Sequence, residues 1–568
     1  MTTIDKAITK TINSTFNINE KITLSPTDKK FGDYSTSAAL RLAGKIGITP
    51  KEFYDKIYTN LLAIESVQLV EQVNGHINIT VDSKYLAKEV ASIINNKKYE
   101  ITHSKSRLKT AIVELLSPNM AKPFSVGHLR SANQGWAAKR ILEATGWNVI
   151  TDNHIGDYGT PFGIWVVGYE KLSSIARLQN DGIYELGRIY VEMRKLIKEE
   201  LLNSKTAISN QVQDWLSKLH KNDPRAIEYY NLFNKISLDH MHAVMSRLNI
   251  STDYEYSESS YVELANELLK KYIKNGVIIE NHDGSAIANL KKYRIDTPIL
   301  LRKSNGLPLY ATTDMATLVF RKDKFNPDLV VYAVGNEQQF HFQQLFALAK
   351  LIGIKYGLYH LSYGLIEDID NETGKRQKMS SRKGTVLLEE LLDKAEERVK
   401  KLINFKSVNK SDIRKIAVGA IKFRDFAQDR KINYLFEWDT IFSLTGFAGP
   451  YIQYAIVRIN KILNDKNYRT TSTLQDNYDY SLEKDILIKL FEYPNLLKSI
   501  SKTFEFHRLA QYLYDLARLV NIYYEKVPVL REGVDVDDRY ARLKFLSWVS
   551  QIMINGLDIL GIEVPDNM

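Results

Sequence analysis

The spacing of hydrophobic residues divides the chain into three regions. In the first region, "TSAALRLAGKIGI" (36–48) has apolar residues at helical spacing, and "HINITVD" (76–82) alternates as a half-buried strand does. Between them, Thr49 and Pro50 are typical of a helix cap followed by the first helical position. We therefore predict a small α+β domain, followed by a polar, basic linker at 95–109.

The second region alternates short apolar runs with helical patterns. Strand patterns occupy 110–117, 147–151 and 327–335, and helical patterns occupy 126–146 and 341–353. This alternation predicts a Rossmann-like parallel sheet with helices on both faces, interrupted by a long, charged helical insert at 169–247. Ligands of such sheets bind at the carboxyl ends of the strands.

The last region contains essentially only helical patterns, such as "EKDILIKLFEYPNLLKSISK" and "ARLKFLSWVSQIMINGLDILG". An all-helical block after an α/β domain predicts a separate helical bundle. The predicted domains are 1–107, 108–435 and 436–568.

Composition narrows the classes of function. Of the 568 residues 44% are hydrophobic and 25% are charged, so the chain can bury cores. It contains no cysteine, which excludes disulfides, thiolate zinc sites and cysteine nucleophiles. There is no signal peptide and no long apolar segment, so we expect a cytoplasmic protein without a membrane span. A net charge of +10 favours an anionic partner such as nucleic acid, although many basic proteins bind none.

The segment "SPNMAKPFSVGHLRS" (117–131) joins the first predicted strand of the sheet to a helix. Helix N-termini attract phosphate, because backbone N–H groups and the helix dipole point there. Gly127 allows the backbone to approach a flat base, and His128 can donate a hydrogen bond to a phosphate oxygen. The alternative is a proline-rich loop with a helix-capping serine and a structural histidine.

A second segment, "RQKMSSRKG" (376–384), combines four basic residues with small hydroxyl residues. A mobile basic loop of this kind can close on a triphosphate and neutralise pyrophosphate as it leaves. The alternative is a solvated run of surface charges.

Together the two segments resemble the signatures of class I aminoacyl-tRNA synthetases, His-Ile-Gly-His and Lys-Met-Ser-Lys-Ser. The wider context resembles the arginyl-tRNA synthetases in particular. Segments similar to that family extend over nearly the whole chain: "FGDYSTSAALRLA" (31–43), "NHIGDYGTPFG" (153–163), "LYATTDMAT" (309–317), "YAVGNEQQFHFQQLFAL" (332–348) and "YDLARLVNIYYEKVPVL" (514–530).

Both signatures depart from the family pattern at a residue that matters for charge. Ser125 stands where the first signature has a histidine, and Ser381 stands where the second has a lysine. Arg382 or Lys383 must then supply the missing charge. Because Gly127 and the helix N-terminus remain, we expect an active enzyme with altered ATP contacts.

The resemblance implies two sets of binding residues. Catalysis is assigned to His128, Lys378, Arg382 and Lys383. ATP contacts are assigned to Pro118, Asn119, Lys122, Pro123, Ser125, Gly127, His128, His341, Lys378, Met379 and Ser380. Arginine contacts are assigned to Glu114, Asn119, Tyr310, Asp314 and Gln338.

These assignments suit the chemistry of arginine, whose guanidinium group needs carboxylate partners. Glu114 ends the first strand of the sheet, and Asp314 lies one helical turn after Tyr310, on the same face. Asn119 and Gln338 suit the α-amino and α-carboxylate groups. Asp314 is alternatively a helix N-cap, and the alternative to His341 near the adenine or ribose is a surface histidine.

The resemblance also implies the reaction and its partners. Arginine, ATP and tRNA(Arg) are the expected substrates, and an arginyl-adenylate is the expected intermediate. ATP would bring its own Mg²⁺, and the 11 scattered histidines indicate no metal held by the protein. The helical bundle would bind the anticodon, the N-terminal domain would touch the outer corner of the tRNA, and we expect a monomer.

Three alternatives stay open from the sequence. Another class I synthetase is one, although the cysteine enzyme needs thiolate zinc ligands and the glutamine enzyme usually ends in β-barrels. A tRNA-binding protein that has lost catalysis is the second, with Ser125 as a symptom. A simple nucleotidyltransferase would not explain the helical last third.

Overall fold

A computed structural model describes residues 2–97, 108–157, 159–304, 306, 309–370, 373–379, 386–402, 408–465, 478–531 and 533–568. Contacts divide the chain into two compact units. The first comprises 1–102, 451–503 and 508–557, and the second comprises 103–450, 504–507 and 558–568. Most of the predicted linker lies outside the described residues.

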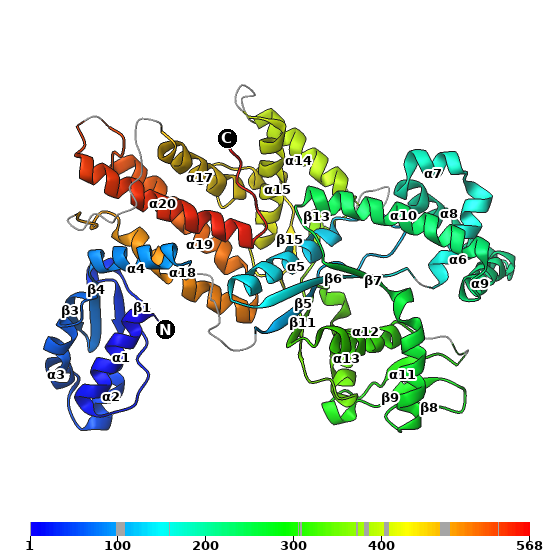
Figure 1. The fold of residues 1–568 in the computed structure, drawn as a ribbon, viewed down its shortest axis with the longest axis horizontal. Helices are drawn as coiled ribbons and strands as arrows, with labels where there is room; N and C mark the ends of the chain where they lie inside the picture. Colours follow the sequence, from blue (N-terminus) through cyan, green and yellow to red (C-terminus); the bar gives the residue numbers. More distant parts are fainter. Residues whose placement is uncertain are drawn as a thin grey trace. The chain divides into compact units, whose positions relative to one another are not determined.

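The N-terminal part of the first unit is an antiparallel sheet covered by helices, as predicted (Figure 1). The strand order is β1 (Ser25–Pro26), β2 (Tyr34–Thr36), β4 (His76–Val81) and β3 (Val67–Val73). The helices are α1 (Thr3–Phe16), α2 (Ala38–Ile46), α3 (Pro50–Leu62) and α4 (Ser83–Asn95). Helix α3 begins at the predicted residue because Thr49 and Glu52 form a capping box.

Helices from the end of the chain complete this first unit. They are α17 (Gly449–Leu463), α18 (Lys484–Thr503), α19 (His507–Lys526) and α20 (Val536–Ile559). Helix α18 packs against α4. At this contact Tyr34 donates a hydrogen bond to Glu492 at 2.9 Å, and Lys484 pairs with Asp33 at 2.9 Å. The predicted N-terminal domain and helical bundle thus pack together.

The second unit contains the predicted parallel sheet. Its order is β12 (Gly357–His360), β11 (Leu329–Tyr332), β5 (Thr110–Glu114), β6 (Asn148–Ile155) and β7 (Tyr254–Ser257), with every neighbouring pair parallel. The chain proceeds from β5 outward to β7 and then returns to β11 on the other side of β5. The strand order therefore reverses between β5 and β11, which is where such sheets form a ligand crevice.

Helices lie between the strands of this sheet in the chain and also follow its last strand. The principal ones are α5 (Gly127–Ala144), α11 (Val262–Lys274), α12 (Tyr310–Phe325), α13 (Gln339–Leu351), α14 (Leu388–Leu402), α15 (Lys410–Phe426) and the short α16 (Trp438–Ile441). Among the described residues, no helix combines the length and the apolar character that a membrane span requires.

The helical insert lies between β6 and β7 and is drawn in cyan and green in Figure 1. Its helices are α6 (Thr160–Leu172), α7 (Ile175–Asp181), α8 (Ile183–Leu202), α9 (Ala207–His220) and α10 (Pro224–Arg247). It begins at Thr160, earlier than the predicted 169. The reason is that α6 is buried on nearly all sides from Phe162 to Gly168 and lacks the polar face that marks a helix in sequence.

Two small sheets were not predicted. One contains β8 (Ile279–Glu280), β9 (Ala286–Ala288) and β10 (Ile299–Arg302), and the other contains β13 (Ile366–Ile369), β14 (Arg376–Lys378) and β15 (Tyr434–Leu435). Strands of two to four residues are too short to show a period of two. The second sheet matters for function, because β14 contains the start of the second basic segment.

Candidate active site

A cavity of about 390 Å³ opens at the reversal of strand order between β5 and β11. Its wall combines the segment after β5, the first turns of α5, the segment after β11 and the hairpin of β13 and β14. Seven of the predicted ATP and arginine residues line it: Asn119, Ser125, Gly127, His128, Gln338, Lys378 and Met379.

His128 lies in the first turn of α5 and folds back toward Ser125. The backbone N–H of Ser125 donates to Nδ1 of His128 at 3.0 Å, which assigns the ring proton to Nε2. Burial lowers the pKa of His128 to about 4, and Lys378 and Lys122 contribute to the lowering. His128 is therefore neutral at pH 7 and offers an N–H donor rather than a positive charge. Helix α5 has Val126 at its N-cap without a side-chain cap, so the capping-serine alternative is wrong.

The other predicted ATP residues are placed around this cavity rather than in its wall. Lys122 lies over the ring of Tyr190 at 4.9 Å, and burial and then Arg194 lower its pKa. The carbonyl of Pro118 accepts a hydrogen bond from Gly156 at 2.9 Å. Pro123 and His341 also lie outside the wall, and Ser380, Arg382 and Lys383 lie outside the described residues.

Backbone hydrogen bonds join the two signature segments. Val126 N–H donates to the carbonyl of Val386 at 3.1 Å, and Leu388 N–H donates to the carbonyl of Phe124 at 2.8 Å. At its other end, the second segment is held by the pairing of β14 with β13. Both ends of the second signature are thus fixed against the nucleotide cavity.

Arg130 lines this cavity, and the sequence analysis did not single it out. Its side chain is 1% exposed, and its Nε donates to Asp425 at 2.7 Å. A second nitrogen donates to the carbonyls of Gly364 and Ile432, at 2.8 and 3.1 Å. Arg130 therefore ties α5 to α15 and to the segment that leads into β13.

A smaller cavity of about 200 Å³ lies near β7 and the start of α12. The sequence missed its central residue, Glu258, which follows β7 directly and is only 9% exposed. Burial and then the like charges of Asp314 and Asp157 raise the pKa of Glu258 to about 8. Within the described residues no ion pair neutralises it. The residues that line the cavity are Gly159, Thr160, Pro161, Leu216, His220, Glu258, Lys303, Leu309, Tyr310 and Thr313.

Two predicted arginine residues meet at this cavity. Tyr310 lines it, and Asp314 lies one turn farther along α12, near enough to influence Glu258. Asp314 also accepts a hydrogen bond from His341 at 2.7 Å, which raises the pKa of His341. Helix α12 begins at Tyr310 and its N-cap is Leu309, so the N-cap alternative for Asp314 is wrong.

Asp157 and Glu114 are held by the protein itself. Asp157 accepts hydrogen bonds from Tyr230 and from the backbone and side chain of Ser259. Glu114 is 6% exposed, and its two carboxylate oxygens accept from Ser117 and Arg321 at 2.7 Å each. Glu258 is thus the carboxylate most in need of a cation.

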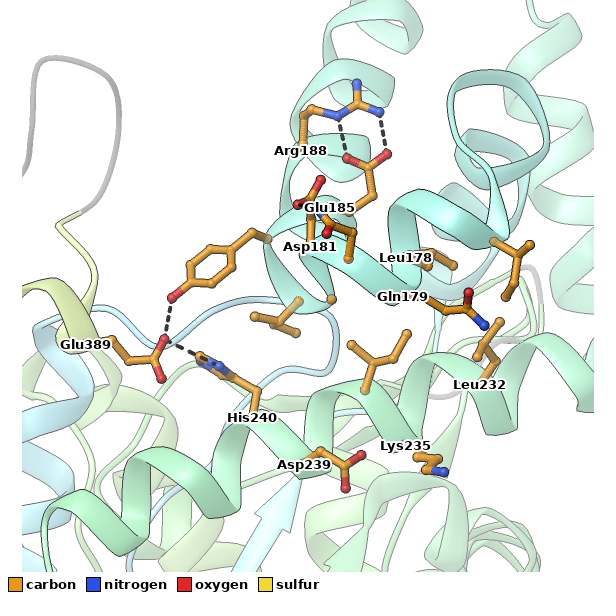
Figure 2. A pocket seen from close by; sticks show the side chains of 16 residues that line it. Leu178, Gln179, Asp181, Glu185, Arg188, Leu232, Lys235, Asp239, His240 and Glu389 are labelled. Carbon is orange, nitrogen blue, oxygen red and sulfur yellow. Dashed lines mark hydrogen bonds and ion pairs between the residues drawn. The ribbon is translucent and has the colours of Figure 1, made fainter.

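A larger cavity, about 890 Å³, lies in the helical insert between α7, α8 and α10 (Figure 2). Tyr184 donates to Glu389, and His240 approaches the same carboxylate at 3.7 Å. Four carboxylates and several aliphatic side chains line this cavity. It therefore does not suit a triphosphate, although Glu389 connects the insert to the exit of the second signature.

Comparisons with known proteins point to one family. The catalytic domain of class I tRNA synthetases (R) matches residues 89–438, the DALR anticodon binding domain matches 452–568, and the arginyl tRNA synthetase N terminal domain matches 2–81. The chain is 30% identical to arginine–tRNA ligase of Clostridioides difficile over 558 residues, covering 96% of this chain and 95% of the relative. It is 28% identical to arginine–tRNA ligase of Fusobacterium nucleatum, covering 95% and 94%.

Solved structures agree in fold. Arginyl-tRNA synthetase of Thermus thermophilus superposes with a TM-score of 0.79 at 22% identity, covering 99% of this chain and 100% of that one. The Plasmodium falciparum arginyl-tRNA synthetase gives a TM-score of 0.77 at 22% identity, covering 100% and 98%.

Proposed function

The chain belongs to the arginyl-tRNA synthetases of class I, and we propose that the two cavities beside its parallel sheet are the ATP and arginine sites of this enzyme. As a member of this family, the chain attaches L-arginine to its tRNA at the expense of ATP, through an arginyl-adenylate, and releases AMP and pyrophosphate. The assignment of each side chain to this reaction is our proposal.

One observation supports the substrate assignment most strongly. Glu258 is a buried carboxylate with two acidic neighbours, and among the described residues it has no ion-pair partner, although Lys303 lines the same cavity. Burying an unpaired charge is costly, so such a group needs a cationic ligand. The guanidinium of arginine suits it, because a planar fork of N–H donors can satisfy Glu258 and Tyr310 together.

In the first step, the carboxylate of arginine attacks the α-phosphate of ATP in line, and pyrophosphate leaves. The neutral Nε2–H of His128 donates to a phosphate oxygen as charge develops there. Lys378 and Lys122 lie close enough to influence His128, and they supply positive charge to the triphosphate. Arg382 or Lys383 adds charge when the second signature closes.

In the second step, the 2′-hydroxyl of the terminal adenosine of the tRNA attacks the carbonyl of the adenylate, and AMP leaves. Neither step needs a nucleophile from the protein, so positioning and charge stabilisation are its contributions. We infer that Mg²⁺ arrives with ATP and is held mainly by phosphates. The described residues contain no group of three or more His, Asp or Glu arranged to hold a metal.

The remaining assignments follow from the family. The helices of 436–568 would bind the anticodon of tRNA(Arg), whose unpaired bases can stack on aromatic side chains. The domain at 1–107 would contact the outer corner of the tRNA. We propose a monomer that acts in the cytoplasm, where charged tRNA is used, and that requires bound tRNA for adenylate formation.

Pyrophosphate exchange with each amino acid, with and without tRNA, tests the proposal. Exchange with arginine alone, and only in the presence of tRNA, is expected. Exchange with cysteine, glutamine or tyrosine would overturn the arginine assignment. If no amino acid supports exchange in the presence of tRNA, the alternative of a tRNA-binding protein without catalysis is correct.

A further inference from the structure

Arg321 is a fully buried guanidinium that joins two strands of the parallel sheet. It lies on α12 and is 0% exposed. One of its nitrogens donates to Glu114 and to Asp152, at 2.7 Å each. Glu114 is the last residue of β5, at the carboxyl end where substrates bind, and lies directly opposite Asp152 of β6.

This cluster is costly to bury. It contains two carboxylates and one guanidinium, and burial raises the pKa of Asp152 while Arg321 opposes that effect. Buried ion pairs are weak contributors to stability, because apolar residues of the same volume often replace them without loss. The cluster therefore calls for an explanation in function.

Within the part of the chain that the structure describes, several polar atoms of the cluster have no protein partner. They are Nε and one terminal nitrogen of Arg321, Oδ1 of Asp152, both ring nitrogens of His154 and the hydroxyl of Tyr261. The rings of His154 and Tyr261 stack at 5.5 Å, and both residues lie close to Asp152. Buried polar groups are normally satisfied by ordered water when protein groups are missing. This interior is thus polar, unlike the apolar core around it.

Glu114 connects this interior to the substrate side. Its second oxygen accepts a hydrogen bond from Ser117, which lines the nucleotide cavity together with Asn119. The carboxylate of arginine must reach that cavity to attack ATP, so the adjoining ammonium group of the substrate comes near Glu114. The guanidinium, at the far end of the substrate, goes to Glu258.

We propose that Arg321 is a positioning residue that holds Glu114 in place, so that Glu114 receives the α-ammonium group of the substrate. Asp152 gives the cluster one negative charge in excess, which the ammonium group balances. Arg321 itself does not touch the substrate. This inference rests on the proposed function and adds a role for Arg321 and Asp152.

Removing Arg321 leaves two facing carboxylates without a counter-charge. We expect Glu114 to turn away from Asp152 or to take up a proton, and in both cases its interaction with the ammonium group weakens. Binding of the guanidinium and of ATP involves other residues, so it should change little.

Three ligands test this in the full-length enzyme with tRNA: arginine, agmatine and 5-guanidinopentanoate. Agmatine keeps the amine and lacks the carboxylate, whereas 5-guanidinopentanoate keeps the carboxylate and lacks the amine. In Arg321→Met, the Kd of arginine and the inhibition constant of agmatine should rise about ten- to a hundredfold, as for a lost charged hydrogen bond. The inhibition constant of 5-guanidinopentanoate should change less than about threefold. An equal rise for all three ligands would overturn the proposal.

Asp152→Asn is the second variant, because it has the same shape and keeps Arg321 against Glu114. It should raise the Kd of arginine and the inhibition constant of agmatine several-fold and leave the inhibition constant of 5-guanidinopentanoate unchanged. An unchanged ratio of the two inhibition constants would again overturn the proposal. Arg130→Met is the matched control. Arg130 is also buried and also paired with an aspartate, but it lies at the nucleotide cavity. Its loss should change the KM for ATP and leave the ratio of agmatine to 5-guanidinopentanoate unchanged.

The wild-type enzyme separates this inference from the proposed function. If the wild type fails to form arginyl-adenylate in the presence of tRNA, the proposed function is wrong. If it does so and the variants do not alter the ligand ratio, only the role of Arg321 is wrong.

Discussion

The two cavities beside the parallel sheet have different charged surroundings, basic at the nucleotide cavity and mainly acidic at the arginine cavity, where Lys303 also lines the wall. The nucleotide cavity combines Lys378, nearby Lys122 and the N-terminus of α5, all of which favour phosphate. The arginine cavity contains Glu258, with Asp157 and Asp314 as acidic neighbours. ATP is an anion and arginine carries two cationic groups, so the lysines suit ATP and the carboxylates, once ionised, suit arginine. The reacting carboxylate of arginine must reach from the acidic cavity to the basic one.

The cavities also differ in how their key groups are held. At the nucleotide cavity, backbone hydrogen bonds fix Phe124 and Val126 against the exit of the second signature. A change of one side chain leaves that framework intact. At the arginine cavity, specificity depends on individual carboxylates, one of which is unpaired. We therefore expect single substitutions to weaken the binding of arginine more than the binding of ATP.

The largest effect is expected from Glu258→Gln. This change removes the buried carboxylate that balances the guanidinium and leaves a cation to be buried without a partner. Breaking a buried ion pair in this way costs about 3–5 kcal/mol, so kcat/KM for arginine should fall roughly a hundred- to a thousandfold. The KM for ATP should change less than about threefold. Aminoacylation kinetics with each substrate varied in turn measure both.

Glu255→Gln provides the control for this prediction. Glu255 lies on β7, three residues before Glu258, and pairs with His242 at 3.0 Å, outside the arginine cavity. It should leave both KM values unchanged. Equal losses for arginine and ATP in Glu258→Gln would show that Glu258 supports the fold rather than the substrate.

A smaller effect, on the opposite cavity, is expected from His128→Ala. Loss of one donor that stabilises developing charge typically costs about ten- to a thousandfold in rate. The rate of adenylate formation should therefore fall by that factor, whereas the Kd of arginine should change little. Rapid-quench measurement of arginyl-adenylate, with tRNA present, separates the two. An unchanged rate would remove His128 from the phosphate chemistry.

Part of this comparison was predictable from the sequence. The strand, turn and helix from 110 to 146 were predicted because the apolar periodicity is strong, and the nucleotide cavity forms there. Glu258 was missed because a glutamate among serines, in "YSESSYVE", has the pattern of a solvent-exposed residue. It is buried because the short 3-10 helix Glu258–Tyr261 packs against α11 and α12. Arg321 was missed for the same reason, since "FRKDKF" has the composition of a surface charge run.

Arginine binding at the arginine cavity should also depend on pH, in a range where ATP binding at the nucleotide cavity does not. With a pKa of about 8, Glu258 is mainly protonated at pH 7 in the free enzyme. Arginine binds the ionised form, so binding releases a proton and the affinity rises as the pH increases toward 8. The Kd of arginine should fall roughly twenty-five-fold between pH 6.5 and pH 8.5 and level off above about pH 9. Calorimetry in buffers of different ionisation enthalpy measures both the Kd and the proton release.

Two variants assign this pH dependence. His341, whose pKa Asp314 raises, is a second titratable group beside this cavity, and loss of its proton favours a cation in the same direction. Glu258→Gln should abolish most of the change in the Kd of arginine with pH, and His341→Gln should remove the remainder. A slope that persists in both variants would mean that neither group senses the substrate.

The smallest effect is expected from Ser125→His, at the position where the first signature departs from its family. The Ser125 hydroxyl lies 3.1 Å from Nδ1 of His128, and Ser125 forms a bridge with Leu387 in the exit of the second signature. A histidine adds a longer donor at the nucleotide cavity without altering the backbone. One added hydrogen bond is worth about 0.5–1.5 kcal/mol, so the KM for ATP should fall about two- to tenfold while the Kd of arginine stays constant. Ser125→Ala is the control and should raise the KM for ATP by a similarly small factor. If the wild type is inactive and Ser125→His restores activity, then a single side chain also determines ATP binding at the nucleotide cavity. The expectation that single substitutions affect arginine more than ATP would then be wrong.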